Sequence, residues 1–240
     1  MKSVSEQKAG KRQIDDKPDD ITSYDVNYIK DINGFYAHPI KDGTYPGIIL
    51  IHEWWGLNDT IKKTAETLAV YGYNVLAVDL FHGVIAKDPN EAMKQVTSVD
   101  QREAIQNMNA AFQYLKKHNS SKIASWGWCF GGGQSMQLAL NTKNLSATVI
   151  YYGNLETNTS KLSSITWPIL GIFGDKDATI PVAKVDEFRD SINSLKIQNE
   201  IYIYPGVGHA FANPTGPNHA PKETADAWDK TIIFLNKILK

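Results

Sequence analysis

The segment Gly127-Trp128-Cys129-Phe130-Gly131 contains the only cysteine of this 240-residue chain. Small residues on both sides of a nucleophile are typical of a tight turn from a strand into a helix, which exposes the central side chain. Both flanks fit this turn, because residues 122–125 have the pattern of a short buried strand and a helical run begins near Gln134. The motif therefore predicts a strand–turn–helix unit with a thiol as the nucleophile.

The alternative for Cys129 is a small, inert core residue, as lone cysteines often are. The predicted turn argues against that alternative, because it leaves a backbone N–H and the N-terminus of a helix facing the side chain. Such a helix start favours thiolate over thiol and offers a donor to a developing oxyanion.

A thiol nucleophile needs a base and an acid that orients the base, and in a fold built on this turn both follow the nucleophile, acid first. The apolar strand predicted over 167–173 runs into a turn that contains Asp175 and Asp177. The alternating segment 199–204 leads into a glycine-rich loop that contains His209. We predict His209 as the base. Asp177 is the preferred acid, while Asp175 remains the alternative because it could instead cap the turn.

A further apolar strand, residues 46–51, ends in the segment His52-Glu53-Trp54-Trp55-Gly56. The loop after this strand normally supplies the second oxyanion N–H. At this point the chain resembles the dienelactone hydrolase family of α/β-hydrolases, over about residues 24–238. The motifs that carry the resemblance are residues 52–56, Asp79-Leu80-Phe81, residues 127–132, Asp177 and Gly208-His209-Ala210-Phe211. The resemblance implies an α/β-hydrolase fold with a mostly parallel central sheet flanked by helices.

The resemblance also implies roles for individual residues. Cys129, Asp177 and His209 would form a triad, with the backbone N–H groups of Trp54 and Phe130 as the oxyanion hole. Glu53 would contact the cysteine and help it to become a thiolate when substrate arrives; the alternative for Glu53 is a surface acid or an ion-pair partner. The implied activity is hydrolysis of lactones or small activated carboxylic esters through an acyl-thioester, without a cofactor.

Two positions depart from the family pattern, and both concern the substrate. The archetypal enzymes present arginines to a substrate carboxylate where this chain has Gly83 and Asn213. Arginine binds carboxylates through a fixed two-pronged fork that neither residue reproduces, although His82 or Lys87 stands nearby. A broader carboxylesterase or thioesterase of the same fold is therefore the alternative function. A binding protein that has lost turnover is less favoured, because every triad position is filled.

Aromatic residues gather at the predicted strand ends, where open α/β sheets bind ligands. About half of them are expected in the core, because aromatic side chains often fill buried volume. The residues at these ends are Trp54, Trp55, Phe81, Trp126, Trp128, Tyr151, Tyr152 and Phe211. As substrate-binding candidates we select Trp55, Phe81, His82, Tyr151, Phe211 and Asn213.

The composition excludes several partners and sites. With 25 basic and 26 acidic residues, the net charge of −1 favours neither nucleic acid nor an anionic membrane as a partner. No histidine pair has the helical spacing of a zinc motif, so no metal is predicted. One cysteine cannot form an intramolecular disulfide, which suits the cytoplasm. The oligomeric state stays open between monomer and dimer.

The chain is predicted to form one domain over residues 23–240, after a charged leader over 1–22 that is expected to be disordered. A hairpin is expected first, from residues 23–29 through residues 31–34 to residues 35–37, with a turn at Asn33-Gly34. Strands and helices then alternate, with helices over 60–71, 99–118 and 225–239, which implies parallel strands joined by right-handed crossovers.

Overall fold

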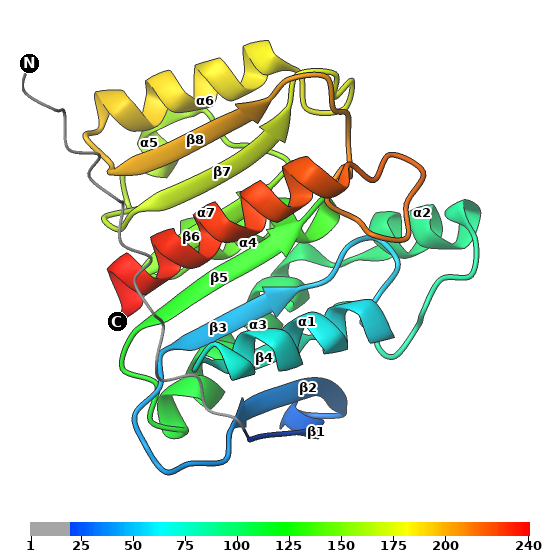
Figure 1. Cartoon of the computed structure of the whole chain (residues 1–240), viewed down its shortest axis with the longest axis vertical. Coiled ribbons are helices and arrows are strands. Elements are labelled where there is room, and N and C mark those ends of the chain that lie inside the picture. The colour runs from blue at the N-terminus through cyan, green and yellow to red at the C-terminus, as the bar shows by residue number, and fades with distance from the viewer. Residues whose placement is uncertain (1–19) are drawn as a thin grey trace, which may run out of the picture.

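The computed structural model describes residues 20–240, which form one eight-stranded sheet with helices on both faces (Figure 1). The strand order is β1-β2-β4-β3-β5-β6-β7-β8. The pairs β1–β2 and β2–β4 are antiparallel, whereas all other neighbours are parallel. The strands are β1 Ile21–Ile29, β2 Ile32–Pro39, β3 Gly47–Ile51, β4 Asn74–Val78, β5 Ile123–Trp128, β6 Ala147–Tyr151, β7 Ile169–Gly174 and β8 Asn199–Tyr204.

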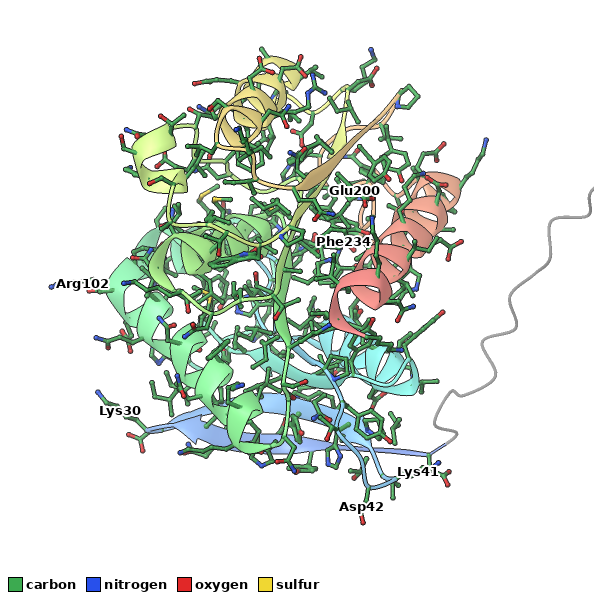
Figure 2. All side chains as sticks on the ribbon, turned by 90° about the vertical axis from the view of Figure 1, so that its left-hand side faces the viewer. Lys30, Lys41, Asp42, Arg102, Glu200 and Phe234 are labelled. Atoms are coloured by element: carbon green, nitrogen blue, oxygen red, sulfur yellow. The ribbon has the colours of Figure 1, made fainter. Side chains whose placement is uncertain are left out.

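Two layers of helices cover the sheet. The helices are α1 Asp59–Val70, α2 Pro89–Ser98, α3 Gln101–Lys117, α4 Phe130–Asn141, α5 Thr159–Leu162, α6 Val182–Ser194 and α7 Pro221–Leu239. Figure 2 views the sheet from its side, with α1 and α7 against one face and α3, α4 and α6 against the other. The predicted mostly parallel α/β fold is confirmed.

The central strands read as continuous apolar runs because both of their faces are buried. Every residue of β3, β4, β5, β6 and β7 is buried, as expected of parallel strands that lie between helices. In Figure 1 the arrows of β3, β5, β7 and β8 point to one end of the sheet, so the loops that follow these strands meet there. These are the loops that contain the predicted site residues.

Local capping explains where the helices near this end begin. The Asp88 side chain accepts hydrogen bonds from the backbone N–H groups of Asn90 and Glu91, and Pro89 occupies the first turn of α2. Asn58 caps α1 in the same way through the N–H of Ile61. Both helices therefore start at fixed points immediately after the loops that border the site.

The N-terminal hairpin exists, but the predicted turn at Asn33-Gly34 was wrong. Ile29 pairs with Ile32, so the two-residue turn consists of Lys30 and Asp31. Lys30 takes the positive φ of 43° that such a turn needs. Gly34 lies inside β2, where an added Cβ would be 2.7 Å from the Ala77 carbonyl oxygen. The glycine therefore permits a close approach of β2 to β4 rather than a turn.

The predicted leader, residues 1–22, falls mostly outside the described residues. Its last two positions, 21 and 22, belong to β1. A scan of residues 20–240 for helices long and apolar enough to cross a membrane finds none.

Candidate active site

Cys129 lies in a strained turn between β5 and α4. Its φ of 53° and ψ of −118° are rarely adopted by residues with a side chain, and it stands immediately before the first residue of α4. The turn is possible only because glycines flank it. A Cβ at Gly127 would lie 2.1 Å from the Gly131 carbonyl oxygen, and one at Gly131 would lie 2.4 Å from that of His52. The sequence motif thus produces the tight turn that presents the thiol.

A chain of hydrogen bonds joins the thiol to a buried carboxylate. The Nε2 atom of His209 lies 3.0 Å from the Sγ atom of Cys129, and its Nδ1 atom lies 2.8 Å from the Oδ2 atom of Asp177. Asp177 is only 4% exposed, and its Oδ1 atom accepts from the backbone N–H groups of Thr179 and Ile180. Both carboxylate oxygens are therefore engaged, which fixes the imidazole ring.

Asp175, the alternative acid, has a different role in the structure. Its Oδ1 atom accepts a hydrogen bond of 2.6 Å from the backbone N–H of Gly206, and its Oδ2 atom lies 3.5 Å from Lys176 Nζ. It ties the end of β7 to the turn after β8. Of the two acids that the sequence offered, the one that lies against the His209 ring is Asp177.

The electrostatics of the three residues favour an imidazolium beside an ionised carboxylate. Burial by itself would lower the pKa of His209, but the hydrogen bonds with Asp177 and Cys129 raise it to about 10. Burial pushes the pKa of Asp177 upward, yet the His209 bond and the two backbone N–H donors hold it below its ordinary value. The site therefore stabilises positive charge on His209.

Two backbone N–H groups near the thiol are free to bind an anion. The N–H groups of Trp54, in the loop after β3, and of Phe130, the first residue of α4, donate to no acceptor within residues 20–240. The Phe130 N–H also lies at the N-terminus of a helix, where aligned peptide dipoles favour negative charge. Both residues border the same cavity as Cys129.

His52 holds the Trp54 loop in place. Its Nδ1 atom is 2.6 Å from the Glu53 carbonyl oxygen, and its Nε2 atom accepts from the Leu80 N–H at 3.1 Å. This pattern requires the neutral tautomer with the proton on Nδ1, in keeping with burial, which lowers the pKa of His52. His52 thus acts as a structural link between the loops after β3 and β4.

Glu53 is held by an asparagine and not by the thiol. Asn213 Nδ2 donates to Glu53 Oε2 at 2.6 Å, while Asn213 Oδ1 accepts from the backbone N–H and the hydroxyl of Thr215. Those two donors fix the orientation of the amide. Within the described residues no hydrogen bond joins Glu53 to Cys129, although both border the same cavity.

The second oxygen of Glu53 is buried without a partner. Its Oε1 atom and the Tyr152 hydroxyl are both buried and lack a well-formed hydrogen bond, although Tyr152 lies near enough to affect the carboxyl. Burial raises the pKa of Glu53 to about 7, against the opposing effects of the His209 charge and the Asn213 amide. Glu53 can therefore hold or release a proton near neutral pH.

A cavity of about 770 Å³ opens above the thiol. It is lined by Glu53, Trp54, Cys129 and His209 and by residues from α2, α4 and the loop after His209. Among the lining residues that the structure describes are no Lys and no Arg, and the charged or titratable groups are Glu53, Cys129, Tyr152 and His209. The volume suits a small organic molecule, and among the described residues of the wall the one cationic group is His209, which is already paired with Asp177.

The structure places only two of the six predicted substrate-binding residues, Trp55 and Asn213, in this cavity. Phe81 is core, because it packs on His52 and Phe130. Phe211 is fully buried between Tyr152 and Tyr204.

The other two predicted residues also lie elsewhere. Tyr151 is buried, and its hydroxyl bonds to the Ala227 carbonyl oxygen. His82 is exposed on another part of the surface, where its ring lies 3.5 Å from Glu103 Oε1. None of these four side chains borders the cavity above Cys129, because a position at a strand end does not decide whether a side chain points into the core or the cavity.

Several cavity residues were not selected from the sequence. Met93 and Val96 of α2, and Gln134 and Gln137 of α4, line the cavity, as does Tyr152. Met93 is 52% exposed, which is unusual for a large apolar side chain on a helix. The sequence signal that could have identified this part of the cavity wall is an apolar residue on the otherwise polar, outer face of an amphipathic helix.

No group of three or more His, Cys, Asp or Glu side chains that could hold a metal ion occurs in the described part of the chain, residues 20–240.

Sequence comparison identifies the chain's relatives. The model of the dienelactone hydrolase family matches residues 32–239. The chain belongs to this family. Its members are hydrolases of ester or lactone bonds, and this chain is therefore an enzyme of that class.

Individual relatives are similar over most of their length. A Saccharolobus solfataricus protein that carries the name carboxymethylenebutenolidase is 29% identical, covering 90% of this chain and 98% of the relative. A Bradyrhizobium protein named as a 2-oxo-3-(5-oxofuran-2-ylidene)propanoate lactonase is 30% identical, covering 84% of this chain and 87% of the relative. A dienelactone hydrolase structure from Klebsiella pneumoniae superimposes with a TM-score of 0.84 at 22% identity, covering 91% of this chain and all of that one.

Proposed function

We propose that this dienelactone hydrolase family member is a cysteine-dependent hydrolase of lactones or small activated esters, which works through an acyl-thioester on Cys129. The observation that carries the proposal is the continuous chain of hydrogen bonds from the thiol through His209 to Asp177. A nucleophile, a base within hydrogen-bond reach and a group that orients the base are the parts that covalent acyl transfer needs.

In the first half of the reaction, His209 Nε2 takes the thiol proton and Cys129 Sγ attacks the carbonyl carbon. The backbone N–H groups of Trp54 and Phe130 stabilise the oxyanion of the tetrahedral intermediate. The imidazolium then gives its proton to the leaving alkoxide, and the acyl group remains on sulfur. Asp177 keeps the proton on Nδ1 throughout, so that Nε2 faces the thiol.

In the second half, His209 removes a proton from water, which attacks the thioester. The same two N–H groups stabilise the second oxyanion, and collapse of this intermediate releases the carboxylic acid and restores the thiol. The cavity above Cys129 is open enough for water to reach the thioester.

Glu53 is proposed to adjust the charge around the thiol. A buried carboxyl whose pKa is raised to about 7 can be neutral or negative at neutral pH. In the neutral form it does not oppose the formation of a thiolate, whereas the charged form does. The hydrogen bond from Asn213 holds the carboxyl where its charge is felt by His209.

The substrate is proposed to be neutral. Within residues 20–240 the wall of the cavity contains no Lys or Arg, and Gly83, where the family resemblance leads one to expect an arginine, does not border the cavity. This favours an uncharged lactone or ester over a carboxylated one, and it also supports the second candidate, a broader carboxylesterase or thioesterase of the same fold. The intact thiol–imidazole–carboxylate chain argues against a non-catalytic binding protein.

A substrate panel tests the proposal. The native chain and Cys129→Ala are assayed against a dienelactone, short p-nitrophenyl esters and thioesters. We expect hydrolysis of neutral esters or lactones by the native chain and none by the variant, because alanine removes the nucleophile but little packing. Undiminished turnover by Cys129→Ala would refute the cysteine mechanism.

A further inference from the structure

A second cavity, of about 200 Å³, lies behind the active site. It shares Glu53, Tyr152 and Asn213 with the cavity above Cys129, so the two cavities adjoin at these three residues, which are called the partition below. Its other walls come from α1, from the ends of β5 and β6, and from α7. Figures 1 and 2 show α1 and α7 on the same face of the sheet.

The wall of this second cavity is aromatic and apolar. Trp128, Tyr151 and Trp228 contribute three large rings, and Ile61 adds an aliphatic side chain. A cavity with such a wall favours apolar occupants over water, because water there would find few hydrogen-bond partners.

Three hydroxyl groups in the wall are already used by the protein, whereas the Tyr152 hydroxyl, at the border with the active site, is buried without a hydrogen-bond partner. Thr64 donates to the Thr60 carbonyl oxygen at 2.9 Å, Thr224 donates to the Ala220 carbonyl oxygen at 2.8 Å, and the Tyr151 hydroxyl donates to Ala227 at 2.9 Å. A ligand therefore finds mostly ring faces and methyl groups. In the described part of the chain, the residues that line this cavity include no Lys, Arg or His, and Glu53 is the one carboxylate among them.

The second cavity adjoins the surface independently of the active-site mouth. A surface groove of about 530 Å³ shares Thr60, Thr64, Pro214 and Trp228 with it. None of these four residues lines the cavity above Cys129. A small molecule can thus approach the rear of the partition between α1 and α7 without passing the thiol.

We propose that this rear cavity is a binding site for one uncharged, ring-sized aromatic molecule or group, separate from the reacting cavity. The three rings supply stacking surface, and the volume accommodates a single ring. An aromatic carboxylate is excluded, because its charge would be desolvated beside Glu53 with no cation to pair it. The proposal does not depend on the cysteine mechanism, since it concerns binding behind the partition.

The ring can come from a free molecule or from the substrate's own alcohol. Titration with 4-methylphenol, a neutral analogue of the tyrosine side chain, tests the first source by calorimetry and by the fluorescence of Trp128 and Trp228. We expect saturable binding of this phenol and none of 4-methylbenzoate over the same concentration range.

Two matched variants on α1 locate the bound ring. Thr64 borders the rear cavity, whereas Thr67, one turn further, borders only the surface groove. Each donates its hydroxyl to the carbonyl oxygen four residues earlier, at 2.9 Å, so replacement by Phe removes the same bond in both. We expect Thr64→Phe to weaken phenol binding at least about tenfold by overfilling the cavity, and Thr67→Phe to leave it unchanged.

The Thr64→Phe and Thr67→Phe variants also distinguish the two sources of the ring. If the substrate's alcohol occupies the cavity, Thr64→Phe raises KM for a phenyl ester but not for the matching methyl ester; if the site takes a free molecule, neither KM changes. Thermal unfolding checks that the variants fold. If Thr64→Phe does not fold, the smaller substitution Thr64→Leu replaces it in both measurements. Absence of phenol binding to the native chain, or equal binding by the Thr64 and Thr67 variants, overturns the proposal.

Discussion

The Nε2 atom of His209 lies 3.0 Å from the Sγ atom of Cys129, although 80 residues separate them in the chain. The parallel sheet explains this distance. Cys129 follows β5 and His209 follows β8, with β6 and β7 between them, and the carboxyl ends of all four strands lie at one edge. Loops that are remote in sequence therefore meet at the thiol.

Removal of either partner of the thiol should reduce turnover. We expect His209→Ala to lower kcat by several orders of magnitude, and Asp177→Ala by somewhat less, on the order of 10⁴-fold, because the ring would lose its orientation but remain present. Steady-state kinetics with a p-nitrophenyl ester measure the effect.

Asp175→Ala is the matched control, since Asp175 lies two residues away and bonds to Gly206 instead of the ring. It should keep kcat near the native value. If Asp175→Ala lost as much activity as Asp177→Ala, the assignment of the acid would be reversed.

Cys129→Ser tests whether the site is adapted to sulfur. The hydroxyl can occupy the same turn, but it is a far weaker acid than a thiol, and the Glu53 carboxyl borders the same cavity. We expect folded protein with a kcat well below the native value. A serine variant as active as the native enzyme would show that Glu53 does not act on a thiol specifically.

Introducing a cation should change the preference for substrate charge. Asn213 borders the cavity and stands at one of the two family arginine positions. We expect Asn213→Arg to raise kcat/KM for a carboxylated lactone, with a gain of about 1–3 kcal/mol of transition-state binding.

Asn213→Met is the control for this change, because it removes the amide from Glu53 without adding charge. The ratio of kcat/KM for anionic and neutral substrates should rise only in the arginine variant. An equal ratio in both variants would mean that the loop after His209 does not face the substrate carboxylate.

Glu53 should make stability depend on pH. Burial raises the pKa of Glu53 from the ordinary 4.5 to about 7 in the folded state. The contribution of Glu53 to the free energy of unfolding is therefore fully present below pH 4.5 and is lost as the pH rises through 7. Glu53→Gln removes this loss and can keep the bond from Asn213. We expect the variant to gain stability relative to the native chain between pH 4.5 and 7, by up to about 3 kcal/mol, with little further change above pH 7.

Denaturant unfolding at a series of pH values measures this difference. His209 and Tyr152, the titratable neighbours of Glu53, are present in both proteins, so the comparison isolates the carboxyl. A difference that stayed constant from pH 4.5 to 7 would mean that Glu53 is not protonated in the folded state.

The residues brought together at the thiol could be predicted because each belongs to a local pattern with strict backbone demands. Gly127 and Gly131 permit the turn at Cys129, and Asp177 and His209 follow apolar strands whose ends must share one edge. Such constraints act over a few residues and can be read from sequence. The same applies to the central strands, whose continuous apolar runs reflect burial on both faces.

Side-chain direction could not be predicted in the same way. Tyr151 and Tyr152 are adjacent, yet the hydroxyl of Tyr151 bonds to α7 while Tyr152 borders the cavity. The cavity wall from α2, including Met93, depends on how that helix packs against distant loops. Likewise, Asn33-Gly34 has the composition of a turn, but the close contact between Gly34 and Ala77 arises only in the folded sheet.

The most direct test of the central proposal is to trap the acyl group on sulfur. The native chain is mixed with a p-nitrophenyl ester, quenched in acid within the first turnover and digested for peptide mass spectrometry. The proposal predicts that the peptide containing Cys129 gains the mass of the acyl group, and that His209→Ala, with its base removed, shows no such gain in the same interval. A native enzyme that releases p-nitrophenol in the first turnover while its Cys129 peptide stays unmodified would contradict the proposal.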